Sequence, residues 1–485
     1  MKLTTVIALA AGEGLALMVG GCSGVQQAET PPVAEPAGLV YDESVTSKAT
    51  GFFRVECDTK GVWRFITPGG HGFFMAANNG PQKAKGDYCK ALGYDPFGRA
   101  VKEKYADTAA WAVEAVRRLR NWNFNTITTW LEPLSPELHN KGLAWTMVVH
   151  FGKSFSGAKN VADANLLAGV KNGKIKFPNV FSAAYPEHCR KMAQQLCAPH
   201  RDDPTLVGWF IDNEIRWNGP ISWNEADREG VGLYNGVAAL PSGHSARVAL
   251  ETFLAERGLK LTDTVAPSVK REFLRLIARR YFEVTIAALK AADPNHAVLG
   301  CRFAGANTTC DVVWEEAGHA CDAVSVNWYP TAEPETNYVR ADWRHHAPSW
   351  EERMAELVAL TRKPLIISEW AYRGGDTGHK NSKGAGQRCP TQAIRARCSE
   401  LFASKMIGHY AVIGYSHFKY VDQPLLGRFD GEDSNYGLVN EKDEPYRELT
   451  EALARVQGEI YRCRPNRVGP KIIGPDAGDH CEGKR

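Results

Sequence analysis

The sequence lacks the large net charge, the paired cysteine motif and the long internal apolar segment that mark nucleic-acid-binding, zinc-binding and membrane-spanning proteins. The formal net charge is only +3 over 485 residues, which argues against nucleic acid or an anionic surface as the main partner. None of the 12 cysteines forms a CxxC pair, so neither a zinc site nor any other metal site is expected. Beyond the first 21 residues, no stretch is apolar for long enough to cross a bilayer. With 44% hydrophobic and 23% charged residues, the composition is that of an ordinary globular protein.

The N-terminus has the pattern of a bacterial lipoprotein signal. A short positive start and an apolar run lead to Val19-Gly20-Gly21-Cys22, which resembles a lipobox. We therefore expect residues 1–21 to be a signal peptide and Cys22 to carry a lipid that anchors a secreted protein to the bacterial cell envelope, in the periplasm or on the outer surface. Glu13 interrupts the apolar run and leaves a soluble secretory signal as the alternative. Residues 22–49, rich in Pro, Ala and Glu, predict a flexible linker.

The cysteines predict disulfides if the chain is exported, because the compartments beyond the inner membrane are oxidising. Cys389 with Cys398 and Cys463 with Cys481 are the natural first pairs. Eleven cysteines remain once Cys22 is set aside, so at least one stays free, and the connectivity stays open.

Residues 50–460 predict one catalytic domain with an α/β fold, a (β/α)8 TIM barrel. An N-terminal β-hairpin comes first, and a Cys-containing tail, residues 461–485, forms a short C-terminal extension. In between, short apolar runs alternate with amphipathic helical stretches, which is typical of βα units around a parallel sheet. The eight runs are 72–78, 124–130, 144–150, 206–212, 297–303, 323–329, 364–370 and 411–418.

Active sites of such barrels lie at the C-terminal ends of the strands. Among the polar residues at the ends of the eight runs are two carboxylates, Glu214 and Glu369. Cleavage of a glycosidic bond with retention of configuration needs two carboxyl groups about 5–5.5 Å apart, one as nucleophile and one as general acid/base. The acid needs a raised pKa, and Trp209, Phe210 and Trp217 could form the apolar wall that raises it. The alternative for either glutamate is a structural ion pair.

The two motifs resemble those of clan A glycoside hydrolases. Residues 208–214 (GWFIDNE) resemble the strand-four motif that carries the acid/base, and residues 364–370 (PLIISEW) resemble the strand-seven nucleophile motif. The hairpin at 53–74 and the loop at 418–446 resemble those of family 50 β-agarases, and family 42 β-galactosidases share much of the pattern. The similarity spans roughly residues 50–455.

The resemblance implies that Glu214 is the general acid/base, that Glu369 is the nucleophile and that Tyr329 orients Glu369. It also implies that Asn213 binds the sugar 2-hydroxyl, a contact that strengthens in the transition state. Other polar residues at the strand ends or in the last loop are expected to bind substrate, namely His150, Arg302, Asn327, Trp370, His417, Gln423, Glu432 and Asn435.

The expected substrate is a polysaccharide or oligosaccharide with β-linked galactose, cleaved with retention and without a cofactor. We expect short soluble oligosaccharides to be preferred over gelled agarose, in a pocket walled by the 245–292 stretch and by the loops near Cys310 and Cys389. One alternative is a catalytically silent carbohydrate-binding lipoprotein, and another is a clan A β-glycosidase of different sugar specificity. A metal-dependent hydrolase would need clustered histidines where the sequence has Asn78-Asn79. A Ca²⁺ site in residues 428–435 lacks EF-hand spacing.

Overall fold

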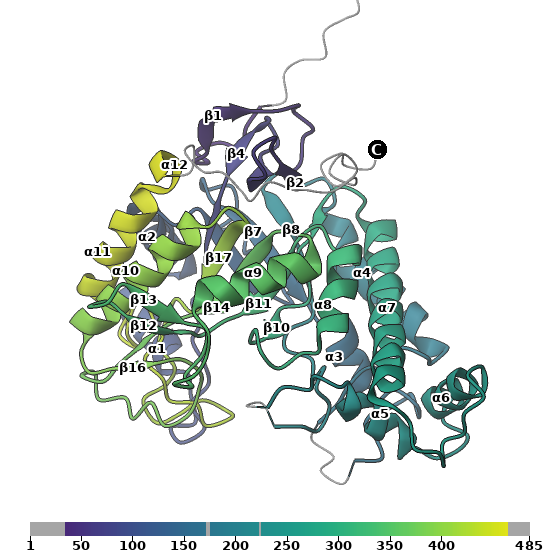
Figure 1. The fold of residues 1–485 in the computed structure, drawn as a ribbon. Helices are drawn as coiled ribbons and strands as arrows, with labels where there is room; N and C mark the ends of the chain where they lie inside the picture. Colours follow the sequence, from purple (N-terminus) through teal and green to yellow (C-terminus); the bar gives the residue numbers. More distant parts are fainter. Residues whose placement is uncertain (1–33, 171–174, 223–224, 464–485) are drawn as a thin grey trace, which may run out of the picture. The chain divides into compact units, whose positions relative to one another are not determined.

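The computed structural model, which describes residues 34–170, 175–222 and 225–463, is built around a nine-strand parallel sheet (Figure 1). The order of the strands in the sheet is β10-β11-β14-β17-β5-β6-β7-β8-β9. In chain order these strands are β5 (Met75–Asn79), β6 (Thr126–Trp130), β7 (Ala144–Val149), β8 (Leu206–Ile211), β9 (Ala297–Val298), β10 (Phe303–Ala304), β11 (Val324–Asn327), β14 (Leu365–Trp370) and β17 (Val412–His417).

The first and last strands in this order, β10 and β9, come from a single segment of the chain. β9 and β10 are the two halves of residues 297–304 and are separated by four residues. Between them, the amide of Ile211 donates to the carbonyl of Gly300 (2.9 Å) on one side. On the other side, the amide of Arg302 donates to Oγ of Ser325 in β11 (2.9 Å). The sheet therefore curls until its two edges meet in this run, which gives it a barrel-like form.

All eight apolar runs predicted from the sequence contain a strand of this sheet, and the fifth contains two. Every residue of β5, β7, β8, β14 and β17 is buried, as expected where both faces of a parallel sheet are covered. The fifth run breaks because Gly300 (φ +87°) and Arg302 (φ +48°) adopt left-handed backbone, which cannot continue a strand. Sequence periodicity does not reveal this break.

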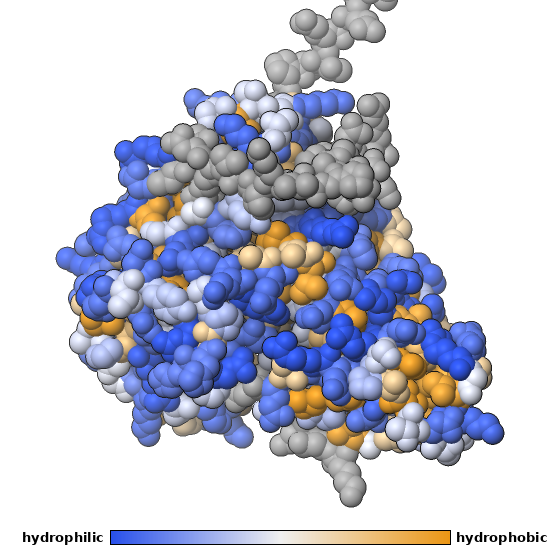
Figure 2. Space-filling view, in the orientation of Figure 1, coloured by the Kyte–Doolittle hydropathy of each residue, from blue (hydrophilic) through white to orange (hydrophobic). Residues whose placement is uncertain are grey.

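Helices lie around the curled sheet (Figure 1). Asp107 caps α2 as predicted, its side chain accepting from the amide of Ala110 (2.8 Å), and Ser349 and Glu352 form a capping box on α9. The face drawn in Figure 2 is mostly hydrophilic. The helices are α1 (Pro96–Lys104), α2 (Thr108–Asn121), α3 (Phe151–Ser156), α4 (Ala184–Leu196), α5 (Val231–Ala238), α6 (Ser245–Ala255), α7 (Pro267–Ala292), α8 (Asp311–Ala320), α9 (Trp350–Thr361), α10 (Gln392–Gly408), α11 (Arg447–Gly458) and α12 (Ile460–Cys463).

A four-stranded antiparallel sheet precedes the parallel sheet in the chain, in the order β1-β4-β3-β2. β2 (Arg54–Cys57) and β3 (Trp63–Ile66) form the predicted hairpin, and β4 (His71–Phe73) follows. β1 (Asp42–Thr46) pairs with β4, so residues 42–46 are wrongly assigned to the flexible linker 22–49. Pairing with β4 at Asp42 and Thr46 holds this segment in place although its composition resembles a linker. Two small ribbons join β12 (Thr331–Glu333) to β13 (Tyr338–Arg340), and β15 (Arg373–Gly374) to β16 (Arg388–Cys389).

The buried cysteines do not form the predicted disulfides. Cys389 and Cys398 lie side by side, but their sulfur atoms are 3.9 Å apart, far beyond a disulfide bond of about 2.05 Å. The other buried cysteines of the described chain are also free thiols. The signal peptide, Cys22 and the pair Cys463–Cys481 fall outside the side chains that the structure describes. Within the described ranges, no helix combines the length and the apolar character that a membrane span requires.

Candidate active site

Glu369 lies near the end of β14, where two side chains hold both of its carboxylate oxygens. Nη2 of Arg302 donates to Oε1 (2.5 Å), and the hydroxyl of Tyr329 donates to Oε2 (2.8 Å). The residue as a whole is 6% exposed. Charge-assisted bonds of this kind are among the strongest in proteins, so they fix the orientation of the carboxylate. The predicted contact of Tyr329 with Glu369 is present.

Arg302 reaches Glu369 from the break in the fifth run. It is fully buried, and its guanidinium carbon lies 4.6 Å from the ring of Trp130 and 5.2 Å from that of Phe210. Its Nε donates to Oδ1 of Asn213 (2.8 Å). Arg302 was predicted to bind substrate hydroxyls; its Nε and Nη2 bond to protein groups, and its buried Nη1 has no partner among the described residues.

Glu214 follows β8 and has a different environment. Its Oε1 accepts from Nδ2 of Asn327 (2.9 Å). Burial and, secondly, the neighbouring Glu369 carboxylate raise the pKa of Glu214 to about 7. About half of the Glu214 side chains are therefore still protonated at pH 7, whereas Glu369 is paired with a guanidinium. Opposite environments for two nearby carboxyl groups are how glycosidases separate the acid from the nucleophile.

Asn327 and Asn213 link the two carboxylates. Nδ2 of Asn327 donates to Oδ1 of Asn213 (3.0 Å) as well as to Glu214, and Oδ1 of Asn327 accepts from the hydroxyl of Ser368 (2.8 Å). A continuous network thus runs from Glu214 through Asn327, Asn213 and Arg302 to Glu369. Asn327 was predicted to bind substrate, but its amide is engaged with Glu214, Asn213 and Ser368.

Asp212 is a buried acid that sequence reasoning overlooked, although it directly precedes Asn213-Glu214. It accepts from the amides of Gly152 (2.6 Å) and Lys153 (2.8 Å) at the start of α3, and from the hydroxyl of Tyr281 (2.8 Å). Burial raises its pKa to about 6. Asp212 (φ +81°) and Glu214 (φ +52°) both have left-handed backbone, which costs energy in residues with a Cβ. Asp212 therefore anchors the strained turn that presents Glu214.

Both glutamates open into one cavity of about 790 Å³, a size typical of small-ligand sites. Of the predicted site residues, Glu214, Glu369, Asn213, Tyr329, His150 and Glu432 line it. Its outer walls come from the loops after β5 and β17, at residues 79–87 and 418–432. Among the described residues, none from 245–292 or from the loop near Cys310 lines this cavity, so these two predicted walls are wrong, whereas Ala385 in the loop before Cys389 does line it. The 245–292 stretch instead forms α6 and α7 of the helix layer.

Besides Arg302 and Asn327, four more residues predicted to bind substrate are buried and do not line the cavity: Trp370, His417, Gln423 and Asn435. Successive strand residues face opposite sides, so Glu369 meets the cavity while Trp370 packs against Phe402 of α10 (5.6 Å between ring centroids). The ring of His417 contacts that of Trp370 (5.2 Å). Gln423 donates to the Glu432 carboxylate (2.5 Å), and Asn435 donates to Asp422 (2.9 Å). They support the loop after β17 and the strand ends.

His150 lines the cavity beside Trp130, whose ring lies 6.0 Å away edge-on. Burial, followed by the charges of Lys153 and Arg302, lowers the pKa of His150 to about 4. The imidazole is therefore neutral at physiological pH and suits hydrogen bonding to a hydroxyl.

The cavity also contains residues outside the predicted set, and most of them lie in loops without a strand-end position. Asp430 and Glu432 pair with Arg428 (3.0 and 2.8 Å), so the acidic loop once considered for Ca²⁺ has its carboxylates engaged by a guanidinium. The additional lining residues include Trp130 at the end of β6, Lys153 in α3, and the loop residues Lys83, Lys85, Asp87, Phe418, Lys419, Arg428, Phe429 and Tyr436.

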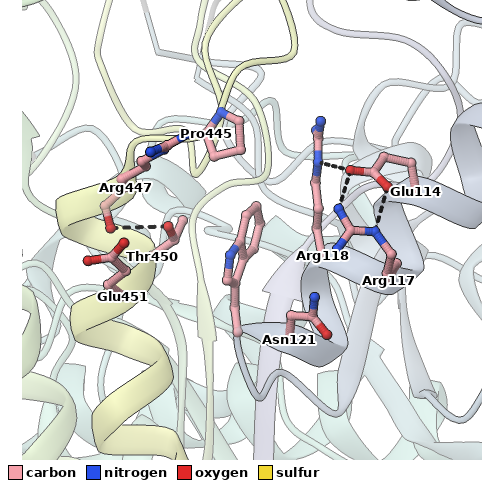
Figure 3. Close-up of a pocket in the computed structure, with 9 residues that line it drawn as sticks. Glu114, Arg117, Arg118, Asn121, Pro445, Arg447, Thr450 and Glu451 are labelled. Carbon is pink, nitrogen blue, oxygen red and sulfur yellow. Dashed lines mark hydrogen bonds and ion pairs between the residues drawn. The ribbon is translucent and has the colours of Figure 1, made fainter.

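A second hollow, of about 290 Å³, lies between α2 and α11 (Figure 3). Glu114 accepts there from both Arg117 (2.7 Å) and Arg118 (2.8 Å). Arg118 also pairs with the buried Asp443 (2.7 Å). The Arg118–Asp443 pair ties helix α2 to the loop before α11, and none of the predicted site residues lines this hollow.

Comparisons with known proteins point to agarases. The chain is similar to β-agarases A and B of Vibrio sp. (strain JT0107), with 27% identity over 418 residues and 25% over 401 residues. These alignments cover 80% and 76% of the chain but 40% and 38% of the relatives, so the chain spans about two fifths of their length. No family model matches the chain.

Solved structures share the fold. The crystal structure of an agarase superposes with a TM-score of 0.69 at 22% identity, covering 90% of this chain and 67% of that one. The structure of an exo-β-agarase superposes with a TM-score of 0.69 at 21% identity, covering 87% and 67%. The likeness supports the predicted barrel-like architecture. The assignment to clan A and the resemblance to family 42 stay predictions.

Proposed function

We propose that the protein is a β-agarase-like glycoside hydrolase of family 50 that cleaves β-linked galactose-containing chains. One observation carries the proposal: Glu214 and Glu369 face one cavity in opposite electrostatic environments. Burial raises the pKa of Glu214 to about 7, and Arg302 and Tyr329 bind both oxygens of Glu369. The similarity to β-agarases over most of the chain supports galactans as the substrate class.

We propose a double displacement. The Glu369 carboxylate attacks the anomeric carbon while protonated Glu214 gives its proton to the departing glycosidic oxygen, which leaves a glycosyl ester on Glu369. Glu214, now ionised, takes a proton from water as the water oxygen attacks the same carbon and releases Glu369. Among the described residues, Nδ2 of Asn213 has no acceptor, because the bonds of Asn213 run through Oδ1. This group is suited to the sugar 2-hydroxyl.

The stereochemical course tests this mechanism directly. Proton NMR of the first product from a soluble agaro-oligosaccharide should show the β-anomer before mutarotation. An initial α-anomer would contradict the double displacement and would make Glu369 a general base that activates water. The reaction must finish before mutarotation mixes the two anomers, so enough enzyme is used to complete it within about a minute.

Two alternatives have distinct outcomes. A silent carbohydrate-binding protein would bind the oligosaccharide without any product, and the intact pair of carboxyl groups disfavours it. A β-glycosidase of other specificity would prefer a β-glucoside or β-mannoside over every galactoside while still depending on Glu214 and Glu369. A panel of red-algal galactans and aryl β-glycosides, with products identified by chromatography, separates these alternatives.

We further propose export to the cell envelope through lipid attachment at Cys22. A diacylglyceryl group anchors stably, unlike a single acyl chain. The wild-type protein should sediment with membranes, and Cys22→Ser should shift it to the soluble fraction or leave it unprocessed. Wild-type protein found soluble, with cleavage at another position, would favour the soluble signal suggested by Glu13.

A further inference from the structure

Phe429 is an exposed aromatic residue at the mouth of the cavity. It lines the cavity that contains Glu214 and Glu369, and 69% of its surface is exposed. The other aromatic residues that line this cavity are buried or half-buried. A single exposed phenylalanine needs no explanation on an ordinary surface. At the mouth of a cavity that receives a ligand, however, its apolar face is available to that ligand.

The loop holds Phe429 in a defined position. Its turn is closed by bonds from the amide of Arg428 to the carbonyl of Glu432 (2.8 Å) and from the amide of Gly431 to the carbonyl of Arg428 (2.9 Å). The Arg428 guanidinium pairs with Asp430 and Glu432 and lies 5.3 Å from the centre of the Phe429 ring. The backbone and one neighbour of the ring are thus fixed before a ligand arrives, which lowers the entropic cost of binding.

We propose that Phe429 is a stacking platform for a sugar of the substrate chain beyond the two units at Glu214 and Glu369, and that it sets a preference for longer oligosaccharides. A galactose ring has an apolar C–H face, which an aromatic ring can remove from water, and a polar rim, which the charged groups of Arg428 and Asp430 can meet. This proposal rests on the proposed function, because the occupant is the chain cleaved at the two glutamates.

Chain-length dependence tests the platform in the full-length protein. For Phe429→Ala, we expect KM to rise about tenfold on the longest soluble agaro-oligosaccharides, a typical value for one aromatic contact. The loss should shrink steadily as the substrate shortens. Phe429→Tyr should restore most of the affinity, because it keeps the ring. Trp343→Ala is the matched control: Trp343 is 66% exposed and does not line the cavity, so no chain-length effect is expected.

Binding separates failure of the platform from failure of the proposed reaction. Calorimetry on Glu369→Gln and on Glu369→Gln/Phe429→Ala measures the same oligosaccharide series without turnover. If the wild type cleaves the oligosaccharides but Phe429→Ala loses nothing, or loses the same factor at every length, the platform is wrong. If no oligosaccharide is cleaved while binding still weakens with the Phe429 change in a length-dependent way, the platform holds and the reaction is wrong.

Discussion

The buried guanidinium of Arg302 bonds directly to the carboxylate of Glu369, with 2.5 Å between Nη2 and Oε1. The two residues are 67 positions apart in the chain and come from the broken fifth run and from β14. Removing one partner of a buried pair leaves an uncompensated charge, which is strongly destabilising. The pair therefore stabilises the fold of the site and fixes the orientation of the Glu369 carboxylate.

Arg302→Met should lower kcat by at least about 100-fold, because Glu369 loses its orienting donor and its counter-charge. Arg302→Lys should recover little, since an ammonium cannot bridge Glu369 and Asn213 as the planar guanidinium does. Steady-state kinetics with thermal unfolding checks this. Arg279→Met is the control, because the exposed Arg279 of α7 pairs with the buried Glu316 of α8 and does not line the cavity. Equal effects on kcat from both methionine variants would contradict a role for Arg302 in the site.

Substitutions of Glu369 and Glu214 should impair the reaction in different ways. Glu369→Gln should abolish turnover of every substrate, since no covalent intermediate can form. Glu214→Ala should largely spare the first step with good leaving groups, which need no protonation. Azide should rescue Glu214→Ala and give a β-glycosyl azide. An α-azide formed by Glu369→Ala would also agree with the assignment. Variants that behave alike on all leaving groups would refute it.

The alkaline limb of the pH profile should belong to Glu214. A general acid must be protonated, and the pKa of Glu214 is about 7, so kcat/KM on substrates with poor leaving groups should fall as pH rises above that value.

The stability of the folded protein should depend on the same protonation of Glu214. The pKa of Glu214 is about 7 in the folded protein and about 4.3 in the unfolded chain, so the folded state binds this proton more tightly. The contribution of Glu214 to stability therefore falls as pH rises from about 4.3 to about 7. The gain in Tm of Glu214→Gln over wild type should be larger at pH 8 than at pH 4.5.

Asn327→Ala should move that alkaline limb to higher pH. The Asn327 amide stabilises the ionised form of Glu214 and so lowers its pKa, which means that its removal favours the protonated form. Ser368→Ala, which removes only the donor that orients Asn327, should cause a smaller shift in the same direction. The pH dependence of kcat/KM for the three proteins measures this. A shift to lower pH would show that Asn327 acts on Glu214 in another way.

The sequence by itself determined the eight strand runs, the cap at Asp107 and the two strand-end glutamates, because hydrophobic alternation and short motifs are local properties of the chain. It also indicated the contact of Tyr329 with Glu369 through resemblance. Only the tertiary structure decided what the polar strand-end residues do. Arg302 turns under the site because left-handed backbone breaks its strand, and Trp370 faces α10 because strand residues alternate. Phe429 reaches the cavity because the loop after β17 folds over it. These outcomes depend on contacts between segments far apart in the chain, which no local pattern records.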